Sequence, residues 1–204
     1  MKKILFVTFL SIVLLFPFAL ELYSDKKTVI TEEIKSNNDT QALSDATVEK
    51  AEANEIFSNP SRLVIPKLDI DAQVEFVGED DEGRMDVPKK DENVAWWKLG
   101  VIPGQQGSAV IAGHYDKKDG GPAVFYNLGN LNIGDEIRIV DEEGVTRVFK
   151  VFRKEVFKDE TFPLQEVFAD NSGERLNLIT CEGVFDSASK NYSDRLVVFS
   201  ELSE

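Results

Sequence analysis

Cysteine and histidine each occur once, as Cys181 and His114, in a chain of 204 residues. A single cysteine excludes an intramolecular disulfide and a Cys-x-x-Cys redox pair, and one of each excludes a zinc site rich in either residue. Basic residues are also scarce, because 23 Lys and Arg face 37 Asp and Glu and the net charge is −14. This charge disfavours a broad electrostatic surface for nucleic acid or anionic lipid. We therefore expect no nucleic acid, and a neutral, cationic or peptidic partner.

One long apolar run stands near the start of the chain, ILFVTFLSIVLLFPFAL at residues 4–20. Its 17 residues are at the short end of what spans a bilayer as a helix, and Lys2 and Lys3 precede it. The flank shows no small-residue cleavage pattern, so we expect residues 1–23 to be an uncleaved signal anchor with a cytosolic N-terminus. A cleaved signal peptide with an atypical site is the alternative.

The rest of the chain divides into a polar segment and a β-rich segment. Residues 24–60 are rich in Lys, Glu, Asn, Asp, Thr and Ala, and this composition predicts a flexible polar linker. Residues 61–204 hold short apolar stretches between turn residues, which favours an all-β barrel or sandwich. The expected strands are residues 63–65, 70–76, 108–112, 136–140, 145–157, 175–180 and 196–199, with short helical turns at 93–99, 123–128 and 164–168.

The single cysteine and the single histidine both fall where an apolar strand ends. His114 follows an Ala-Gly pair, and Cys181 follows Leu-Ile-Thr. Strand ends form the rim of a barrel, where side chains distant in sequence can meet in an open groove. A thiol is an effective nucleophile and an imidazole shuttles protons at neutral pH, so the pair indicates acyl transfer. The alternative is a Cys181 that merely fills space in the core and a His114 that is an ordinary surface residue.

The order along the chain, histidine before cysteine, excludes several classes of cysteine enzyme. Papain-like and wall-lytic cysteine peptidases run cysteine before histidine, and L,D-transpeptidases need a second histidine that this chain lacks. Caspase-like enzymes need Gln-Ala-Cys-x-Gly, whereas Cys181 stands in Ile-Thr-Cys-Glu-Gly.

Three motifs, in this order, resemble the sortase family. LITC at residues 178–181 looks like the sortase Leu-x-Thr-Cys signature, and AGH at 112–114 looks like its histidine-bearing strand end. Arg195, heading LVVF, looks like its arginine-bearing last strand. Residues 62–70 and 125–135 are similar to the family's opening strand and central segment, so the resemblance covers the expected domain. It implies a closed sortase-like β-barrel of about eight strands, preceded by a membrane helix.

Finer features look most like class F sortases. The Cys-x-Gly-x-Phe-Asp stretch at residues 181–186 carries this likeness, together with a Tyr-x-Asp triplet before the last strand. Asn177 stands where the fuller family signature often has threonine. Many class F-like sequences carry the arginine at the place of Ser193, and Arg195 can reach the same groove because residues two apart on a strand share a face. Arg175 is a weaker candidate, and a solvated strand residue is its simpler reading.

The resemblance implies a mechanism built on three residues. The thiolate of Cys181 would attack the Thr–Gly carbonyl of a Leu-Pro-x-Thr-Gly-type sorting signal and form a thioacyl-enzyme. His114 would protonate the leaving amine and later accept a proton from the incoming amine. Arg195 would donate to a peptide carbonyl or its oxyanion. By the same resemblance, the residues that line the peptide groove are Ala112, Ile179 and Thr180.

Three further features are weighed with this family in view. Residues 157–168 resemble the pocket loop for the apolar start of the signal, through Phe157, Phe162, Pro163, Leu164, Val167 and Phe168, with ordinary packing as the alternative. The acidic run at residues 79–83 invites Ca²⁺, which some sortases use, but it lacks alternating ligand spacing, so a solvated turn is favoured and we expect no cofactor or metal. Of Trp96 and Trp97, adjacent on an expected helix, one should be core and the other should lie at the groove rim.

The resemblance also implies a cellular setting. It places the enzyme in the cell membrane of a Gram-positive bacterium, single-pass, with its barrel outside. The partners would be surface proteins that carry sorting signals and a cell-wall precursor that offers an amine. Two alternatives stay open: a non-catalytic β-barrel module that binds peptide or wall, and an enzyme that only hydrolyses peptides.

Overall fold

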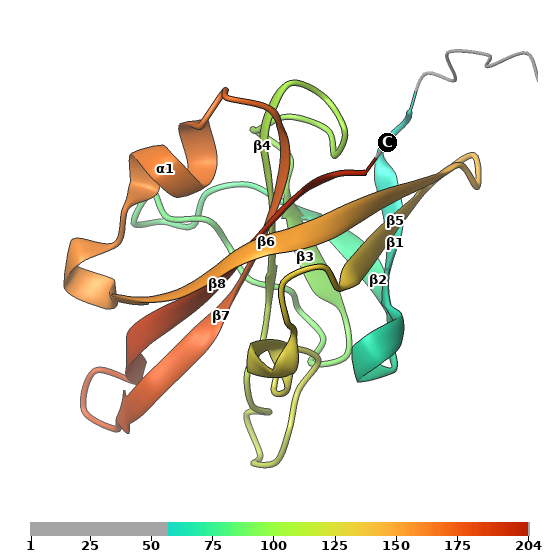
Figure 1. Cartoon of the computed structure of the whole chain (residues 1–204). Helices are drawn as coiled ribbons and strands as arrows, with labels where there is room; N and C mark the ends of the chain where they lie inside the picture. The colour runs from blue at the N-terminus through green and yellow to red at the C-terminus, as the bar shows by residue number, and fades with distance from the viewer. Residues whose placement is uncertain (1–56, 204) are drawn as a thin grey trace, which may run out of the picture. The chain divides into compact units, whose positions relative to one another are not determined.

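The computed structural model describes residues 57–203 (Figure 1). The signal anchor and most of the linker expected from the sequence lie outside the described residues. Within them, no helix is long and apolar enough to cross a membrane. The strands are β1 (Pro60–Ile65), β2 (Ile70–Val77), β3 (Val94–Trp97), β4 (Gly107–Gly113), β5 (Glu136–Asp141), β6 (Thr146–Lys158), β7 (Glu174–Asp186) and β8 (Asn191–Leu202). The helical elements are η1 (Pro66–Leu68), η2 (Leu128–Asn130), η3 (Asp159–Thr161) and α1 (Leu164–Ala169).

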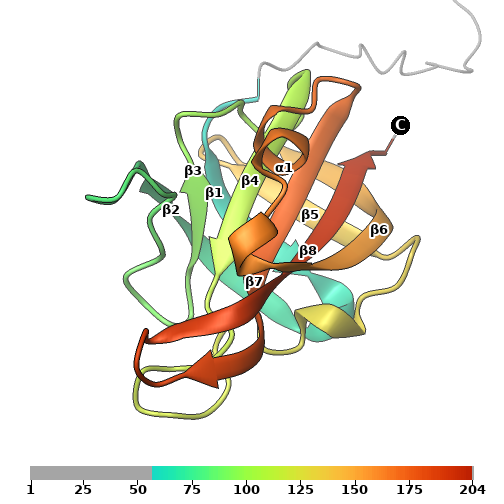
Figure 2. The ribbon, with the colours of Figure 1, turned by 90° about the vertical axis from the view of Figure 1, so that its left-hand side faces the viewer.

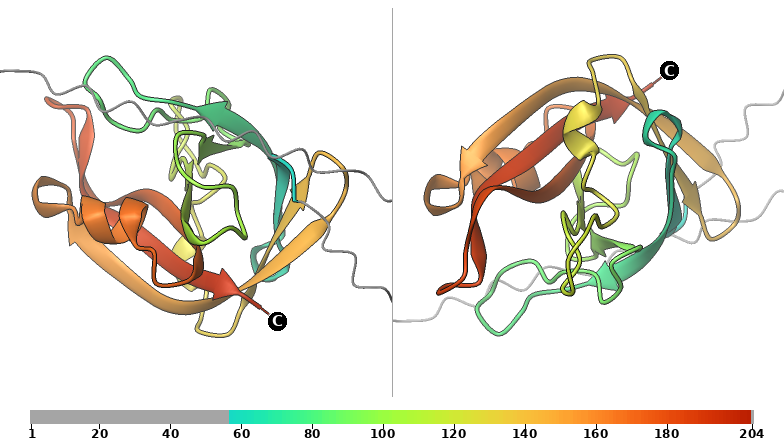
Figure 3. Two further views of the ribbon diagram at one scale, coloured as in Figure 1. Left: turned by 90° about the horizontal axis from the view of Figure 1, so that it is seen from above. Right: turned by 90° about the horizontal axis from the view of Figure 1, so that it is seen from below.

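These eight strands close into a barrel in the order β1-β2-β3-β4-β7-β8-β6-β5, with β5 returning to β1 (Figure 3). The β2–β3 and β4–β7 pairs are parallel, and the other neighbours are antiparallel. The all-β barrel of about eight strands expected from the sequence is therefore confirmed. Because every strand of the closed barrel has a neighbour on both sides, the barrel has no edge strand.

The alternation of side chains along each strand fills the barrel interior. On β4, Ala109 and Ile111 point inward and are fully buried, while Val110 between them faces outward. On β7, Leu176 and Leu178 do the same. A fully buried Leu, Ile or Phe side chain stabilises the fold by about 1.5–3 kcal/mol, so this interior is the main source of stability.

The outer face of β4, β7 and β8 is also apolar, and α1 covers part of it (Figures 1 and 2). Val167 of α1 is fully buried against Val110, Ile179 and Val197. The helix expected at residues 164–168 is thus confirmed. Strands β4 and β7 are buried on both faces, which explains why their sequences read as continuous apolar runs.

The helical turn expected at residues 93–99 is wrong, because Val94–Trp97 forms strand β3 between β2 and β4. The short apolar run suits either element, and pairing on both sides favours the strand. Strand alternation still separates the tryptophans: Trp96 is a core residue, and Trp97 packs edge-on against Phe168 outside the barrel with ring centroids 6.0 Å apart. The turn expected at 123–128 is non-helical until η2 begins at Leu128.

The packed domain begins a few residues before the expected boundary at residue 61. Phe57 is buried in the core, and the backbone N–H of Ser58 donates to Asp141 Oδ2 at 2.9 Å. Asp141 also accepts from the N–H groups of Glu143 and Val145, which closes the β5–β6 hairpin. Burial opposes ionisation of this carboxyl, but these backbone hydrogen bonds prevail and lower the pKa of Asp141.

Candidate active site

The parallel pairing of β4 and β7 aligns the ends of these strands. The last register pair is Ala112 with Ile179, and the Thr180 hydroxyl donates to the Gly113 carbonyl at 2.9 Å. One residue further, the chains reach His114 and Cys181. Side chains two apart on a strand share a face, so both lie on the outer face, on the side of Ala112 and Ile179. The structure thus brings the single histidine and the single cysteine to one strand end.

The backbone around His114 is held tightly. The Phe125 N–H donates to the His114 carbonyl at 2.9 Å, and the Phe125 ring is fully buried against Gly113. A Cβ at Gly113 would lie 2.5 Å from Phe125 Cδ2, so only glycine fits here. The ring atom Nε2 of His114 lies 2.8 Å from the Pro88 carbonyl oxygen. Because a carbonyl only accepts, this contact assigns the proton to Nε2 and leaves Nδ1 for proton exchange.

Cys181 is half-buried and is a free thiol. Burial raises the pKa of the Cys181 thiol, since desolvation disfavours the thiolate. The positive charge of Arg195 lowers the pKa of this thiol, while the carboxylates of Asp116 and Asp159 raise it. The net shift is upward, so the surroundings of Cys181 favour the neutral thiol.

Arg195 is the cross-strand partner of Cys181 in the β7–β8 register. Directly opposite residues in an antiparallel pair have Cβ atoms about 4.5–5.5 Å apart and share a face, so the guanidinium lies beside the thiol. Ser193, the alternative position for the arginine, donates its hydroxyl proton to Asp194. Arg175 pairs with Glu201, at the other end of the β7–β8 pairing. The structure therefore brings Arg195, and not Arg175, to Cys181.

The residues expected to line a peptide groove divide into two groups. Ala112 and Ile179 lie on the outer face beside the strand ends. Thr180 is buried and braces β4 against β7, so its side chain is structural. Of the side chains expected to form the apolar pocket, Leu164 is exposed and Pro163 directly precedes α1, while the other four pack around this helix. They are Phe157, Phe162, Val167 and Phe168.

Asn177 attaches helix α1 to the barrel. Its Nδ2 donates to the carbonyl of Val167 in α1 at 2.7 Å, and the side chain is buried. A threonine here would be too short to make the same amide contact. The departure from the family signature is therefore matched by a specific contact to α1.

Near Cys181, the structure adds Tyr115, Asp116 and Tyr126, which were not identified from the sequence, to Tyr192 of the Tyr-x-Asp triplet. The Tyr192 hydroxyl donates to Asp116 Oδ2 at 2.7 Å, which joins the β7–β8 hairpin to the loop after His114 (Figure 2). This hydrogen bond raises the pKa of Tyr192 to about 12. The ring of Tyr115 lies 5.8 Å from that of Tyr192 and 4.8 Å from that of Tyr126. Asp116 stands two residues after the histidine, and this was the only sequence signal that pointed to it.

The Cys-x-Gly stretch forms a bulge in the hairpin. The register shifts between Glu182 and Phe185, and Gly183 has a φ of 84°. A Cβ there would lie 2.2 Å from Asp194 Oδ2, so the bulge requires glycine. Phe185 beyond the bulge packs on Tyr192 with centroids 5.2 Å apart. The motif residues thus shape the hairpin beside Cys181.

The acidic run at residues 79–83 forms a turn with its own arginine. Asp80 accepts hydrogen bonds from the backbone N–H groups of Glu82 and Arg84. The Arg84 guanidinium forms ion pairs with the carboxylates of Asp80 and Glu82. In residues 57–203, no group of three or more His, Cys, Asp or Glu side chains converges to hold a metal ion.

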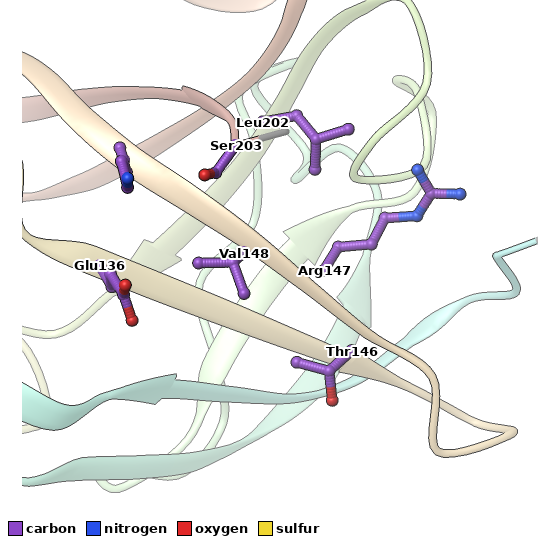
Figure 4. Close-up of a pocket in the computed structure, with 7 residues that line it drawn as sticks. Glu136, Thr146, Arg147, Val148, Leu202 and Ser203 are labelled. Carbon is purple, nitrogen blue, oxygen red and sulfur yellow. The ribbon is translucent and has the colours of Figure 1, made fainter. Parts of the chain in front are cut away.

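A hollow of about 430 Å³ lies at the opposite end of the barrel (Figure 4). Its lining includes Glu136, Thr146, Arg147, Val148 and Leu202. Leu202 is seven residues beyond Arg195 on β8, which corresponds to about 23 Å along the strand. This hollow is therefore separate from the site at Cys181.

The comparisons with known proteins agree with this arrangement. The barrel is similar to sortase C-1 from Actinomyces oris, with 23% identity and a TM-score of 0.56 over 70% of this chain and 73% of that one. A lid mutant of sortase A from Corynebacterium diphtheriae shares 21% identity, with a TM-score of 0.55 over 73% of this chain and 72% of that one. A sortase D5 transpeptidase from Clostridium perfringens shares 18% identity, with a TM-score of 0.54 over 72% of this chain and 79% of that one. Comparison with curated protein sequences found no match.

These structural likenesses show the fold, and they extend over several sortase classes. The family itself is shown by the model of the sortase domain, which matches residues 63–203. That range contains the whole arrangement of His114, Cys181 and Arg195. The chain therefore belongs to the sortase family of cysteine transpeptidases.

Proposed function

We propose that this chain is a membrane-anchored class F sortase that cleaves a Leu-Pro-x-Thr-Gly-type signal between Thr and Gly and transfers the surface protein to a cell-wall amine. One observation carries the proposal. The only cysteine faces Arg195 across β7–β8, and the only histidine ends the strand paired with β7 on its other side.

The first step is acylation of Cys181. The thiol proton passes to Nδ1 of His114, and the thiolate sulfur attacks the threonine carbonyl carbon. The C–N bond then breaks, the leaving glycine amine takes the proton from His114, and a thioester remains. Because burial raises the pKa of Cys181, proton transfer to His114 assists the attack.

The second step reverses the proton flow. An incoming amine attacks the thioester, His114 Nδ1 takes the proton from that nitrogen, and the C–S bond breaks as this proton returns to the Cys181 sulfur. Arg195 supports both steps by stabilising the negative charge that develops near the sulfur and on the carbonyl oxygen. Its hydrogen bonds with described residues use Nη1 and Nη2, so Nε–H is the donor left for a substrate carbonyl. One such donor contributes about 3 kcal/mol in comparable sites.

The remaining parts of the proposal rest on sequence features. The class F assignment is supported by the motif at residues 181–186, whose glycine and phenylalanine shape the hairpin beside Cys181. Anchoring is supported by the apolar run at 4–20, with the barrel outside the membrane of a Gram-positive cell. The partners proposed are surface proteins with sorting signals and a cell-wall amine, and no cofactor or metal is assigned.

Intact-mass spectrometry tests this reaction. The full-length chain in detergent is incubated with Leu-Pro-x-Thr-Gly peptides and variants of that motif, with Cys181→Ala as the control. We expect a thioacyl adduct on the wild type alone, which a small primary amine converts to a transfer product. Adduct resolved only by water would indicate a hydrolase. No adduct with any peptide, together with a Cys181 that resists alkylation, would favour a non-catalytic binding module.

A further inference from the structure

Arg195 is held by a closed triangle of hydrogen bonds with Asp159 and Asn191. Arg195 Nη2 lies 2.9 Å from Asp159 Oδ1 and donates to Asn191 Oδ1 at 2.7 Å. Asn191 Nδ2 donates to the second carboxylate oxygen, Asp159 Oδ2, at 2.7 Å. The guanidinium is mostly buried, with 19% of its side chain exposed. Arg195 Nη1 is bonded to the backbone carbonyls of Tyr192 and Asp194, so the head group is fixed on two sides.

The donors and acceptors of the triangle require a carboxylate at position 159. The arginine can only donate, and the asparagine amide has one accepting and one donating atom. Asp159 accepts at both oxygens and completes the ring. An asparagine at 159 has nearly the same shape but would bring two donors together in every orientation of the two amides. The triangle therefore selects for charge at this residue.

Barrel pairing brings Asp159 to this place. Phe157 of β6 is the register partner of Arg195, and η3 begins two residues later with Asp159. Arg195 is in turn the register partner of Cys181 on β7. Asp159 thus directly follows the end of β6, and it contacts Arg195 from the β6 side of β8, opposite the side on which β7 carries Cys181.

The charges around Cys181 come from several elements. Arg195 on β8 favours the thiolate, whereas Asp159 of η3 and Asp116 after β4 disfavour it. Tyr192 faces the same region, and its pKa of about 12 keeps it neutral. His114 directly follows β4, whose last register pair with β7 lies two residues before Cys181. Asp159 is the carboxylate among these groups that pairs directly with Arg195.

We propose that Asp159 is a positioning residue that acts through Arg195, fixing the guanidinium beside Cys181 and offsetting part of its positive charge there. The positioning role rests on the proposed acyl transfer. The charge effect on the thiol does not, so the two can be tested apart.

Three variants of the full-length chain in detergent separate charge from geometry. Asp159→Asn removes the charge and breaks the triangle, and Asn191→Ala breaks the triangle but keeps the charge. Glu160→Gln removes a neighbouring exposed charge and is the matched control. The pH dependence of Cys181 alkylation by iodoacetamide reports the thiol pKa without interference, since the chain has no other cysteine. Thioacyl formation with the sorting peptide reports positioning, and thermal melting reports folding.

We expect Asp159→Asn to lower the midpoint of alkylation by about half a pH unit and to slow acylation about tenfold or more. Asn191→Ala should slow acylation without lowering the midpoint, and Glu160→Gln should change neither. Local loss of structure would also expose the thiol and slow acylation, so Asn191→Ala, which breaks the same triangle, and the melting temperature separate it from the charge effect. Local unfolding would raise the alkylation rate at every pH and leave the midpoint at the value of an exposed thiol.

Other outcomes would overturn the proposal. A wild-type midpoint in Asp159→Asn rejects the charge effect, and a wild-type acylation rate rejects the positioning role. If none of the sorting peptides forms a thioacyl adduct with the wild-type chain, the proposed function fails. The alkylation midpoints then still decide whether Asp159 offsets the charge of Arg195 at the thiol.

Discussion

The hydrogen bond between Thr180 and Gly113 joins the two residues that directly precede Cys181 and His114. Its donor–acceptor distance is 2.9 Å, and Thr180 is 3% exposed. Thr180→Val retains the shape of the side chain and removes the donor. A buried hydrogen bond of this kind contributes about 1–2 kcal/mol to the free energy of unfolding. At about 2–4 °C per kcal/mol, the melting temperature should fall by a few degrees, and the barrel should stay folded at room temperature.

Catalysis should suffer more than stability. The bond fixes the end of β4 relative to the end of β7, and a shift of about 1 Å between reacting groups costs up to about 100-fold in rate. We expect acylation by the sorting peptide to slow by about 10-fold to 100-fold in Thr180→Val. Thr180→Ser keeps the hydroxyl and should retain most of the rate. Intact-mass time courses and thermal melts measure the two effects on the same samples.

Two results would refute this reasoning about the strand ends. Thr180→Val could acylate at the wild-type rate, which would show that the β4–β7 ladder alone aligns His114 with Cys181. Thr180→Ser could be as slow as Thr180→Val, which would show that the hydroxyl alone does not hold the strand ends and that the packing of the methyl group matters as much.

Gly113→Ala should destabilise the barrel by about 1–3 kcal/mol through overpacking and slow acylation, because the new Cβ would displace buried Phe125 next to His114. Gly129→Ala, whose Cβ would meet an ordinary contact at 3.6 Å, is the control, and equal melting temperatures for the two variants would contradict the packing argument. Hydrogen bonds hold the pKa of Asp141 below its ordinary value. Its ionised form therefore stabilises the fold fully above about pH 4, the ordinary pKa of an aspartate. This stabilisation is lost as the pH falls through the lowered pKa of the folded protein. Asp141→Asn should therefore unfold more easily at pH 7 and show a flatter acid dependence in denaturant titrations, and an unchanged free energy of unfolding at pH 7 would count against the hydrogen bonds of Asp141.

Local sequence patterns predicted most of the strands because an apolar residue every second position suits a half-buried sheet. Ile70–Val77 and Glu136–Asp141 are examples. The patterns were too short at the hairpin of β7 and β8, which pairs as far as Asp186 and Asn191. The residues there are polar or exposed, and cross-strand pairing, which no single segment encodes, extends both strands. Cross-strand pairing with β2 and β4 likewise makes Val94–Trp97 a strand, where a helical turn was expected.

Part of the candidate site could be predicted from the sequence because its chemistry uses residue types that are rare in this chain. A chain with one cysteine and one histidine, each at a predicted strand end, leaves few choices, and the motif around Arg195 added the third residue. The sequence did not show that Thr180 braces the strands instead of lining a groove. That difference depends on which way each side chain points once β4 and β7 pair.

The sequence by itself determined the strand patterns, the acidic charge, the family motifs and the identity of the candidate catalytic side chains, because these follow from composition and short spacing. Only the tertiary structure decided the register that sets Cys181 opposite Arg195 and the contacts of Asp159, 32 residues before its partner Asn191. Such contacts arise from closure of the barrel, which aligns β6, β7 and β8. The balance of charge at the thiol is likewise a property of the closed barrel, since it depends on burial and on distances between strands.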